Sequence, residues 1–284
     1  MRESTGVSAF ATVFFFAAAY FVWEMKASHC CWFESDPLLP FTQPYCWKYL
    51  LFSGLSVTIG GTVQYWDTRA IQKQRDAEAL TTYERVLKGE TPYFYLYLRP
   101  FAVRNTLGIN NQAKSFNPYA PNYWLPNTFD LEELLANALV AYGPVLGLGA
   151  PGEAVGAGRL PSDEREWQAV ILKLMHSAPR ILVIPGSYVG TLWEIGQLKD
   201  ASLLKKTVFV MPPSLEGSEA HDALDTYWRA AKEATQEIGI ELPHYSPSGL
   251  VFSIGNDGRL SQQQQFTTGR VDKGESLRKA IDAL

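Results

Sequence analysis

Two long runs of apolar side chains dominate the first 66 residues of the chain. One extends from Val7 to Trp23 and the other from Tyr49 to Trp66, and neither contains a charged residue. A helix of either length is about long enough to cross a bilayer, and each run ends in a tryptophan, a ring that membrane interfaces favour. The pattern predicts a transmembrane hairpin over residues 1–66 with a loop over 24–48. A cleaved signal peptide and a buried helix are the alternative interpretations of the two runs.

Basic residues near the two runs predict their orientation. Arg69, Lys73 and Arg75 follow the second run, whereas the loop carries only Lys26 and Lys48. Because basic residues gather on the cytoplasmic side, both termini are expected inside and the loop outside. The lipid bilayer is therefore an expected partner of the chain.

All three cysteines, Cys30, Cys31 and Cys46, lie in this loop. Disulfides persist mainly in oxidising compartments, so the distribution agrees with a loop outside the cell. One member of the vicinal pair is a disulfide candidate with Cys46, which leaves an odd thiol for a bond between chains. Free thiols are an equal alternative. A metal site that combines His29 with these cysteines is a further alternative. No metal site is expected elsewhere, because the four histidines are scattered without the spacing of metal ligands.

The polarity pattern changes after the second run. Residues 67–92 are polar and predict a juxtamembrane helical linker. From 93 to 284, strand and helix patterns alternate, which is typical of an α/β domain with an open parallel sheet. Asn256-Asp257-Gly258 adds a turn signal for a hairpin after the last strand. The predicted strands are mostly continuous apolar runs: Tyr93–Leu98, Pro144–Leu148, Arg180–Pro185, Thr207–Met211 and Leu250–Ile254.

A five-stranded parallel sheet of this size is expected to have the flavodoxin-like order second, first, third, fourth, fifth. Ligands bind such sheets beyond the carboxyl ends of the strands, at the switch point between the first and third strands. The chain after the first strand, Arg99-Pro100-Phe101, is therefore expected to face the segment Gly186–Glu194. The loop from Gly149 to Ser162 is expected to border the same crevice.

Two side chains at this crevice are suited to chemistry. Glu194 is placed in the first turn of a helix that begins near Thr191, where the helix dipole favours an ionised carboxylate. Stabilisation of the helix start is the alternative role of this glutamate. Arg99, at a strand end, is suited to pairing with a phosphate, and the alternative is an ion pair with Asp130 or Glu194.

The loop after the second strand is rich in glycine and includes Gly147, Gly149 and Gly152 in a G-x-G-x-x-G pattern. A dinucleotide motif requires a helix to open directly after the pattern, and here the helix signal waits until about Ser162. We interpret the loop as a flap that carries Arg159. An ordinary flexible loop is the alternative.

These motifs together resemble bacterial TIR-like domains. The resemblance covers about residues 93–212 and rests on Tyr-Leu-Arg-Pro-Phe (97–101), the glycine-rich loop, Asp163 with Trp167, and Trp193-Glu194. The segment Gly-Thr-x-x-Glu-Ile-Gly (190–196) is also similar to nucleoside 2-deoxyribosyltransferases, whose fold is related. The acidic residue that those transferases carry shortly before Gly-Thr is missing here, and the Arg-Pro-Phe strand end is unlike common TIR domains.

The resemblance implies a TIR-like domain in which Glu194 matches the glutamate that assists cleavage of the nicotinamide-ribose bond of NAD. NAD then enters as the substrate, and no separate cofactor is expected. Arg99 and Arg159 are expected to hold its diphosphate, and Phe101 or Trp193 to stack on a ring. A bacterial inner-membrane effector in defence or signalling is implied, with self-association as a trigger.

Two other classes of function stay open from the sequence. One is a non-catalytic module that senses a nucleotide or binds a protein at the membrane. The other is an effector whose two spans disrupt the bilayer. The formal net charge of −4 gives no reason to expect nucleic acid as a partner.

Overall fold

The computed structural model of the chain describes residues 46–99, 108–110, 128–150, 156–163, 165–214, 219–266 and 274–284. The chain divides into two compact units, Met1–Ile71 and Gln72–Leu284. Helix α2 (Cys46–Leu87) is the described element of the first unit and also provides the first residues of the second. The account below concerns the second unit, which contains the sheet.

The predicted membrane anchor is not supported. None of the described helices is both long enough and apolar enough to span a bilayer. The second predicted span, Tyr49–Trp66, is part of α2, and its glycine, serine, threonine and glutamine residues dilute the apolar run. The prediction of a two-pass protein of the bacterial inner membrane is therefore wrong. The first predicted span, Val7–Trp23, lies outside the described residues.

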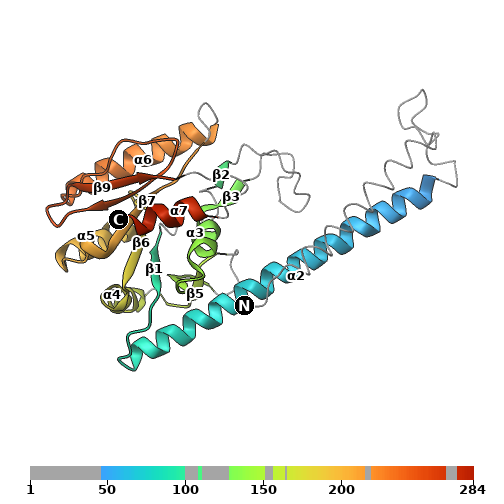
Figure 1. Cartoon of the computed structure of the whole chain (residues 1–284), viewed down its shortest axis with the longest axis horizontal. Helices are drawn as coiled ribbons and strands as arrows, with labels where there is room; N and C mark the ends of the chain where they lie inside the picture. The colour runs from blue at the N-terminus through green and yellow to red at the C-terminus, as the bar shows by residue number, and fades with distance from the viewer. Residues whose placement is uncertain are drawn as a thin grey trace. The chain divides into compact units, whose positions relative to one another are not determined.

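A seven-stranded mixed sheet forms the centre of the second unit (Figure 1). All neighbours from β5 to β7 are parallel, whereas β8 is antiparallel to β7 and β9 is antiparallel to β8. In spatial order the strands are β5 (Gly158–Leu160), β4 (Val145–Leu148), β1 (Tyr95–Leu98), β6 (Arg180–Val183), β7 (Thr207–Met211), β8 (Leu250–Ile254) and β9 (Leu260–Gln265).

The five predicted strands and their order are confirmed, but the five-stranded, all-parallel sheet is wrong. The strand β8 begins beside Met211, at the end of the sheet where β7 ends, so it runs back in the opposite direction. The predicted hairpin then adds β9, with Gly258 at a φ of +83° in the turn. The other added strand, β5, lies inside the loop that was expected to be irregular.

Two apolar layers cover the sheet, one on each face. In β1, Leu96 and Leu98 point to one face, and Tyr95 and Tyr97 point to the other. The first layer includes side chains of α2, α4 (Trp167–Ser177), α5 (Val189–Asp200) and α6 (Glu219–Glu237). The second includes side chains of α3 (Leu131–Leu139) and α7 (Glu275–Asp282). A 3-10 turn (Leu204–Lys206) and a separate antiparallel pair, β2 (Gly108–Asn110) with β3 (Thr128–Asp130), complete the described elements.

Candidate functional site

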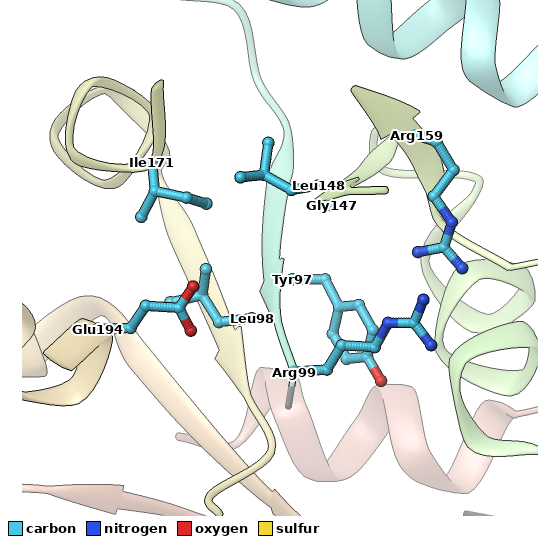
Figure 2. Close-up of a pocket in the computed structure, with 8 residues that line it drawn as sticks. All are labelled: Tyr97, Leu98, Arg99, Gly147, Leu148, Arg159, Ile171 and Glu194. Carbon is cyan, nitrogen blue, oxygen red and sulfur yellow. The ribbon is translucent and has the colours of Figure 1, made fainter. Parts of the chain in front are cut away.

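A small cleft lies at the carboxyl ends of β1 and β4 beside α5 (Figure 2). Its free volume is about 10 Å³, which is room for about one water molecule. The cleft adjoins the predicted switch point between β1 and β6, since Arg99 follows β1 and Glu194 belongs to the helix that follows β6. The residues that line the cleft are Tyr97, Leu98, Arg99, Gly147, Leu148, Arg159, Ile171 and Glu194.

Glu194 enters the cleft from α5. The helix begins at Val189, earlier than expected, so Glu194 lies in its second turn rather than its first. The favourable effect of a helix N-terminus on an anion fades beyond the first turn. Packing of Ile195 and Leu198 into the first apolar layer turns this part of α5 toward the sheet. Only 3% of Glu194 is exposed as a result.

Burial changes the acidity of this carboxyl group. Loss of solvent raises the pKa of Glu194 from 4.5 to about 8. Within the described part of the chain, the carboxyl group accepts no hydrogen bond and faces no cation in an ion pair. The expectation that the helix start keeps Glu194 ionised is therefore wrong, and the neutral form predominates at pH 7.

Three charged side chains form a buried ion triad at the same edge of the sheet. Glu132, in the first turn of α3, pairs with Arg159 Nη2 through Oε1 at 2.5 Å and with Arg99 Nε through Oε2 at 3.2 Å. The backbone N–H of Ala157 also donates to Glu132 Oε1, at 2.8 Å. Arg99 thus pairs with Glu132, a partner that was not considered from the sequence. The side chain of Asp130, one of the two partners considered there, lies outside the described residues.

The triad and Glu194 lie on opposite sides of β1. In Figure 2, the Glu194 carboxyl group lies beside Leu98, whereas the guanidinium groups of Arg99 and Arg159 lie beyond the strand, near Tyr97. The alternation of side chains along β1 gives the same division, because Leu98 belongs to the first apolar layer and Tyr97 to the second. The cleft therefore has an acidic wall and a cationic wall with β1 between them.

Sequence reasoning missed Glu132, although a signal for it exists. The spacing i, i+3, i+4 and i+7 from Glu132 reaches Leu135, Ala136 and Leu139, which are all buried on one face of α3. An acid at a core-facing position of an amphipathic helix indicates a buried cationic partner, because an unpaired charge there is costly.

Other predicted site residues have structural contacts or are not described. Trp193 packs edge-to-face on Trp167 with ring centroids 5.1 Å apart, which uses its ring in packing between α4 and α5. The backbone N–H of Gly149 donates to Leu160 O at 3.2 Å and extends the pairing of β4 with β5. Phe101 and Gly152 lie outside the described residues.

The cysteine and metal predictions receive little structural information. Cys30 and Cys31 lie outside the described residues, as does the side chain of Cys46 at the start of α2. In the described ranges, no group of three or more His, Cys, Asp and Glu side chains is placed to hold a metal ion.

Comparisons with protein-family models, with curated proteins and with solved structures find no match to this chain. The resemblance to TIR-like domains therefore rests on the sequence motifs alone. The physical arguments for a function come from the positions and burial of the charged side chains in the cleft.

Proposed function

We propose that the chain binds NAD or a closely related nucleotide at the cleft and hydrolyses its nicotinamide-ribose bond, with Glu194 as the catalytic group. One observation carries the proposal. Glu194 is 97% buried at the switch point, in a cleft wall, without a cationic partner among the described residues. A buried carboxyl group of this kind favours a ligand that brings a positive charge to it.

The chemistry of NAD fits a single carboxylate. The nicotinamide ring is a cationic pyridinium and leaves as a neutral molecule with the electron pair of the C–N bond, so no acid is needed to protonate it. The positive charge then develops on the ribose ring, and water adds to the anomeric carbon and loses a proton. An anion in a poorly solvated cleft stabilises this charge more strongly than it would in water.

The raised pKa of Glu194 gives the proposal a pH signature. The ionised form is needed for charge stabilisation, and with a pKa of about 8 roughly a tenth of the free protein carries it at pH 7. We expect kcat/KM to rise with pH and to level off above pH 8, because kcat/KM reports the free protein. The cationic ring lowers the pKa of the carboxyl group beside it, so kcat is expected to level off at a lower pH.

The ion triad supports a role for the opposite wall. Arg99 and Arg159 would interact with the diphosphate of the nucleotide, and Glu132 holds both guanidinium groups until then. Because the cleft has room for about one water molecule, a nucleotide enters only when its walls separate. We propose self-association as the event that separates them, in a bacterial defence or signalling response.

The direct test is release of nicotinamide from NAD by the full chain over a range of protein concentrations. Glu194→Gln keeps the shape of the side chain and removes its charge, so turnover is expected to fall at least a hundredfold. Glu233→Gln, the same exchange at an exposed position of α6, is the matched control and is expected to leave turnover unchanged. Absence of turnover at every concentration, or full turnover by Glu194→Gln, contradicts the proposal.

The small volume of the cleft and the engagement of both arginines by Glu132 favour one alternative, a module that senses a nucleotide or binds a protein without turnover. This alternative predicts that NAD binds and stays intact. It also predicts that Glu194→Gln leaves the biological response in place, whereas changes between Gly149 and Arg159 abolish it.

A further inference from the structure

The edge of the sheet next to the cleft is covered by polar side chains of α2. The edge strand β5 pairs on its inner side with β4. On its outer side, the side-chain amide of Gln72 accepts a hydrogen bond from Gly156 N and donates one to Ala157 O, both at 2.9 Å. One amide group therefore supplies the donor and the acceptor that a neighbouring strand would supply. Gln72 is only 2% exposed, so these bonds are shielded from water.

Two further side chains of α2 hold the same stretch, residues 156–159, which we call the β5 segment. Asp76 Oδ1 accepts from the backbone N–H of Arg159 at 2.8 Å and from Gln72 Nε2 at 2.7 Å. Arg75 Nη1 donates to Gly156 O at 2.8 Å. Positions 72, 75 and 76 have the i, i+3, i+4 spacing that puts side chains on one face of a helix.

The backbones of α2 and the β5 segment are also in close contact. A side chain at Gly158 would overlap Arg75 O, and one at Gly156 would overlap the carboxyl group of Glu132. The β5 segment thus lies between α2 on one side and Glu132 on the other. This close packing explains the glycine at 158, where any side chain would meet the backbone of α2, and at 156, where a side chain would displace the carboxyl group of Glu132.

We propose that Gln72 and Asp76 are positioning residues of the cleft. They fix the β5 segment, and the β5 segment carries Arg159 and donates from Ala157 to Glu132, so α2 sets the geometry of the whole cationic wall. The consequence for NAD rests on the function proposed above. Because Glu194 lies on the other side of β1, loss of these contacts weakens the hold on the diphosphate and leaves the glycosidic chemistry intact.

Hydrogen exchange on the full chain tests the structural part of this inference without any turnover. Gln72→Ala and Asp76→Ala are expected to speed exchange of the amides of Gly156 and Arg159, which donate to these side chains, by about tenfold or more. Exchange in β7 is expected to stay unchanged, which separates a local effect from global unfolding. Gln74→Ala removes an exposed glutamine of the same helix, paired with Glu78 at 3.0 Å, and is the matched control.

Kinetics with NAD tests the functional part. Gln72→Ala and Asp76→Ala are expected to raise KM about tenfold with kcat within twofold of the original, whereas simple loss of folded protein lowers kcat at unchanged KM. Asp76→Asn keeps an oxygen that accepts from Arg159 N and is expected to restore KM.

Unchanged exchange in the β5 segment overturns the inference, and so does an unchanged KM despite faster exchange. If the original chain has no turnover at any concentration, the proposed function fails by itself. In that case, hydrogen exchange in the β5 segment alone tests whether Gln72 and Asp76 of α2 fix this segment.

Discussion

The acidity of Glu194 leads to a prediction about stability that requires no ligand. The pKa of this group is 4.5 in its ordinary state and about 8 in the folded chain. Between these two pH values the folded chain binds more protons than the unfolded chain, so its free energy of unfolding falls as pH rises. At about 1.4 kcal/mol per pH unit, the whole interval corresponds to about 5 kcal/mol.

Glu194→Gln removes this titration and keeps the shape and polarity of the side chain. Comparison with the original chain cancels the other titrating groups, which the two proteins share. We take as reference the original chain at low pH, where Glu194 is neutral in both the folded and the unfolded state. Titration of Glu194 lowers the free energy of unfolding from this reference by about 1 kcal/mol at pH 5, about 3 kcal/mol at pH 7 and nearly 5 kcal/mol at pH 9. The glutamine variant is therefore expected to gain stability over the original as pH rises.

Urea unfolding of both proteins at pH 5, 7 and 9 measures this difference. Glu233→Gln, on the exposed side of α6, serves as the control and is expected to show a difference that hardly changes with pH. A difference that stays constant for Glu194→Gln, or that reverses in favour of the original chain at high pH, refutes the reasoning. The second outcome would mean that a cation lies beside the carboxylate in the folded chain.

Three further predictions concern packing within the second unit, and each is measured by urea unfolding at pH 7. Gly158→Ala places a methyl group against the backbone of α2 and is expected to lower the free energy of unfolding by about 2–4 kcal/mol. Gly196→Ala, with open space around it in α5, is the control and is expected to leave this free energy unchanged or to raise it by up to about 1 kcal/mol. Equal effects of the two changes contradict the close packing of α2. Glu132→Ala leaves two buried guanidinium groups without their carboxylate and is expected to cost about 3–5 kcal/mol, and a loss below about 1 kcal/mol would show that the triad is solvated. Trp228→Phe removes the hydrogen bond from Nε1 to Pro243 O and leaves a cavity beside Phe252, with an expected loss of about 2–3 kcal/mol; an unchanged stability would refute the burial of this ring.

The hydrophobic pattern predicted most of the sheet, because continuous apolar strands of four or five residues and the helices between them have strong local signals. The segment Thr207–Met211 was predicted to the residue, and the order of five strands followed from the size of the domain. The short strand β5 was missed since three residues, Gly-Arg-Leu, carry no periodicity. Its outer partner is a set of helix side chains, which no strand pattern indicates.

The membrane prediction failed because it rested on two properties of the sequence that are not sufficient for a span. Length and absence of charge suggested a span over Tyr49–Trp66, but these two properties do not measure how apolar a helix is. Small and polar residues, among them Gly60, Gly61 and Gln64, reduce the hydrophobicity of the run. Absence of charge is also compatible with a helix that does not enter a bilayer.

Local sequence signals also misjudged the two acids of the cleft. The ionisation of Glu194 depends on burial between α5 and the sheet, and this burial is a property of the tertiary packing. The start of α5 at Val189, earlier than Thr191, moved Glu194 away from the helix N-terminus. The burial of Glu132 could have been predicted from its spacing with Leu135 and Leu139. Its partner Arg159, however, lies on a strand that the pattern did not predict.

The contrast between these acids is the strongest argument for a function at the cleft. Glu132 is buried with two arginines and a backbone N–H, so folding alone explains it. Glu194 is equally buried and has no such partner within the described residues, so at neutral pH it opposes folding by about 3 kcal/mol, a large part of the 5–15 kcal/mol that holds a typical domain folded. A leucine or methionine at that position would fill the same space without this loss. A carboxyl group that weakens the fold where parallel strands present ligands is therefore better explained by a positively charged ligand than by packing.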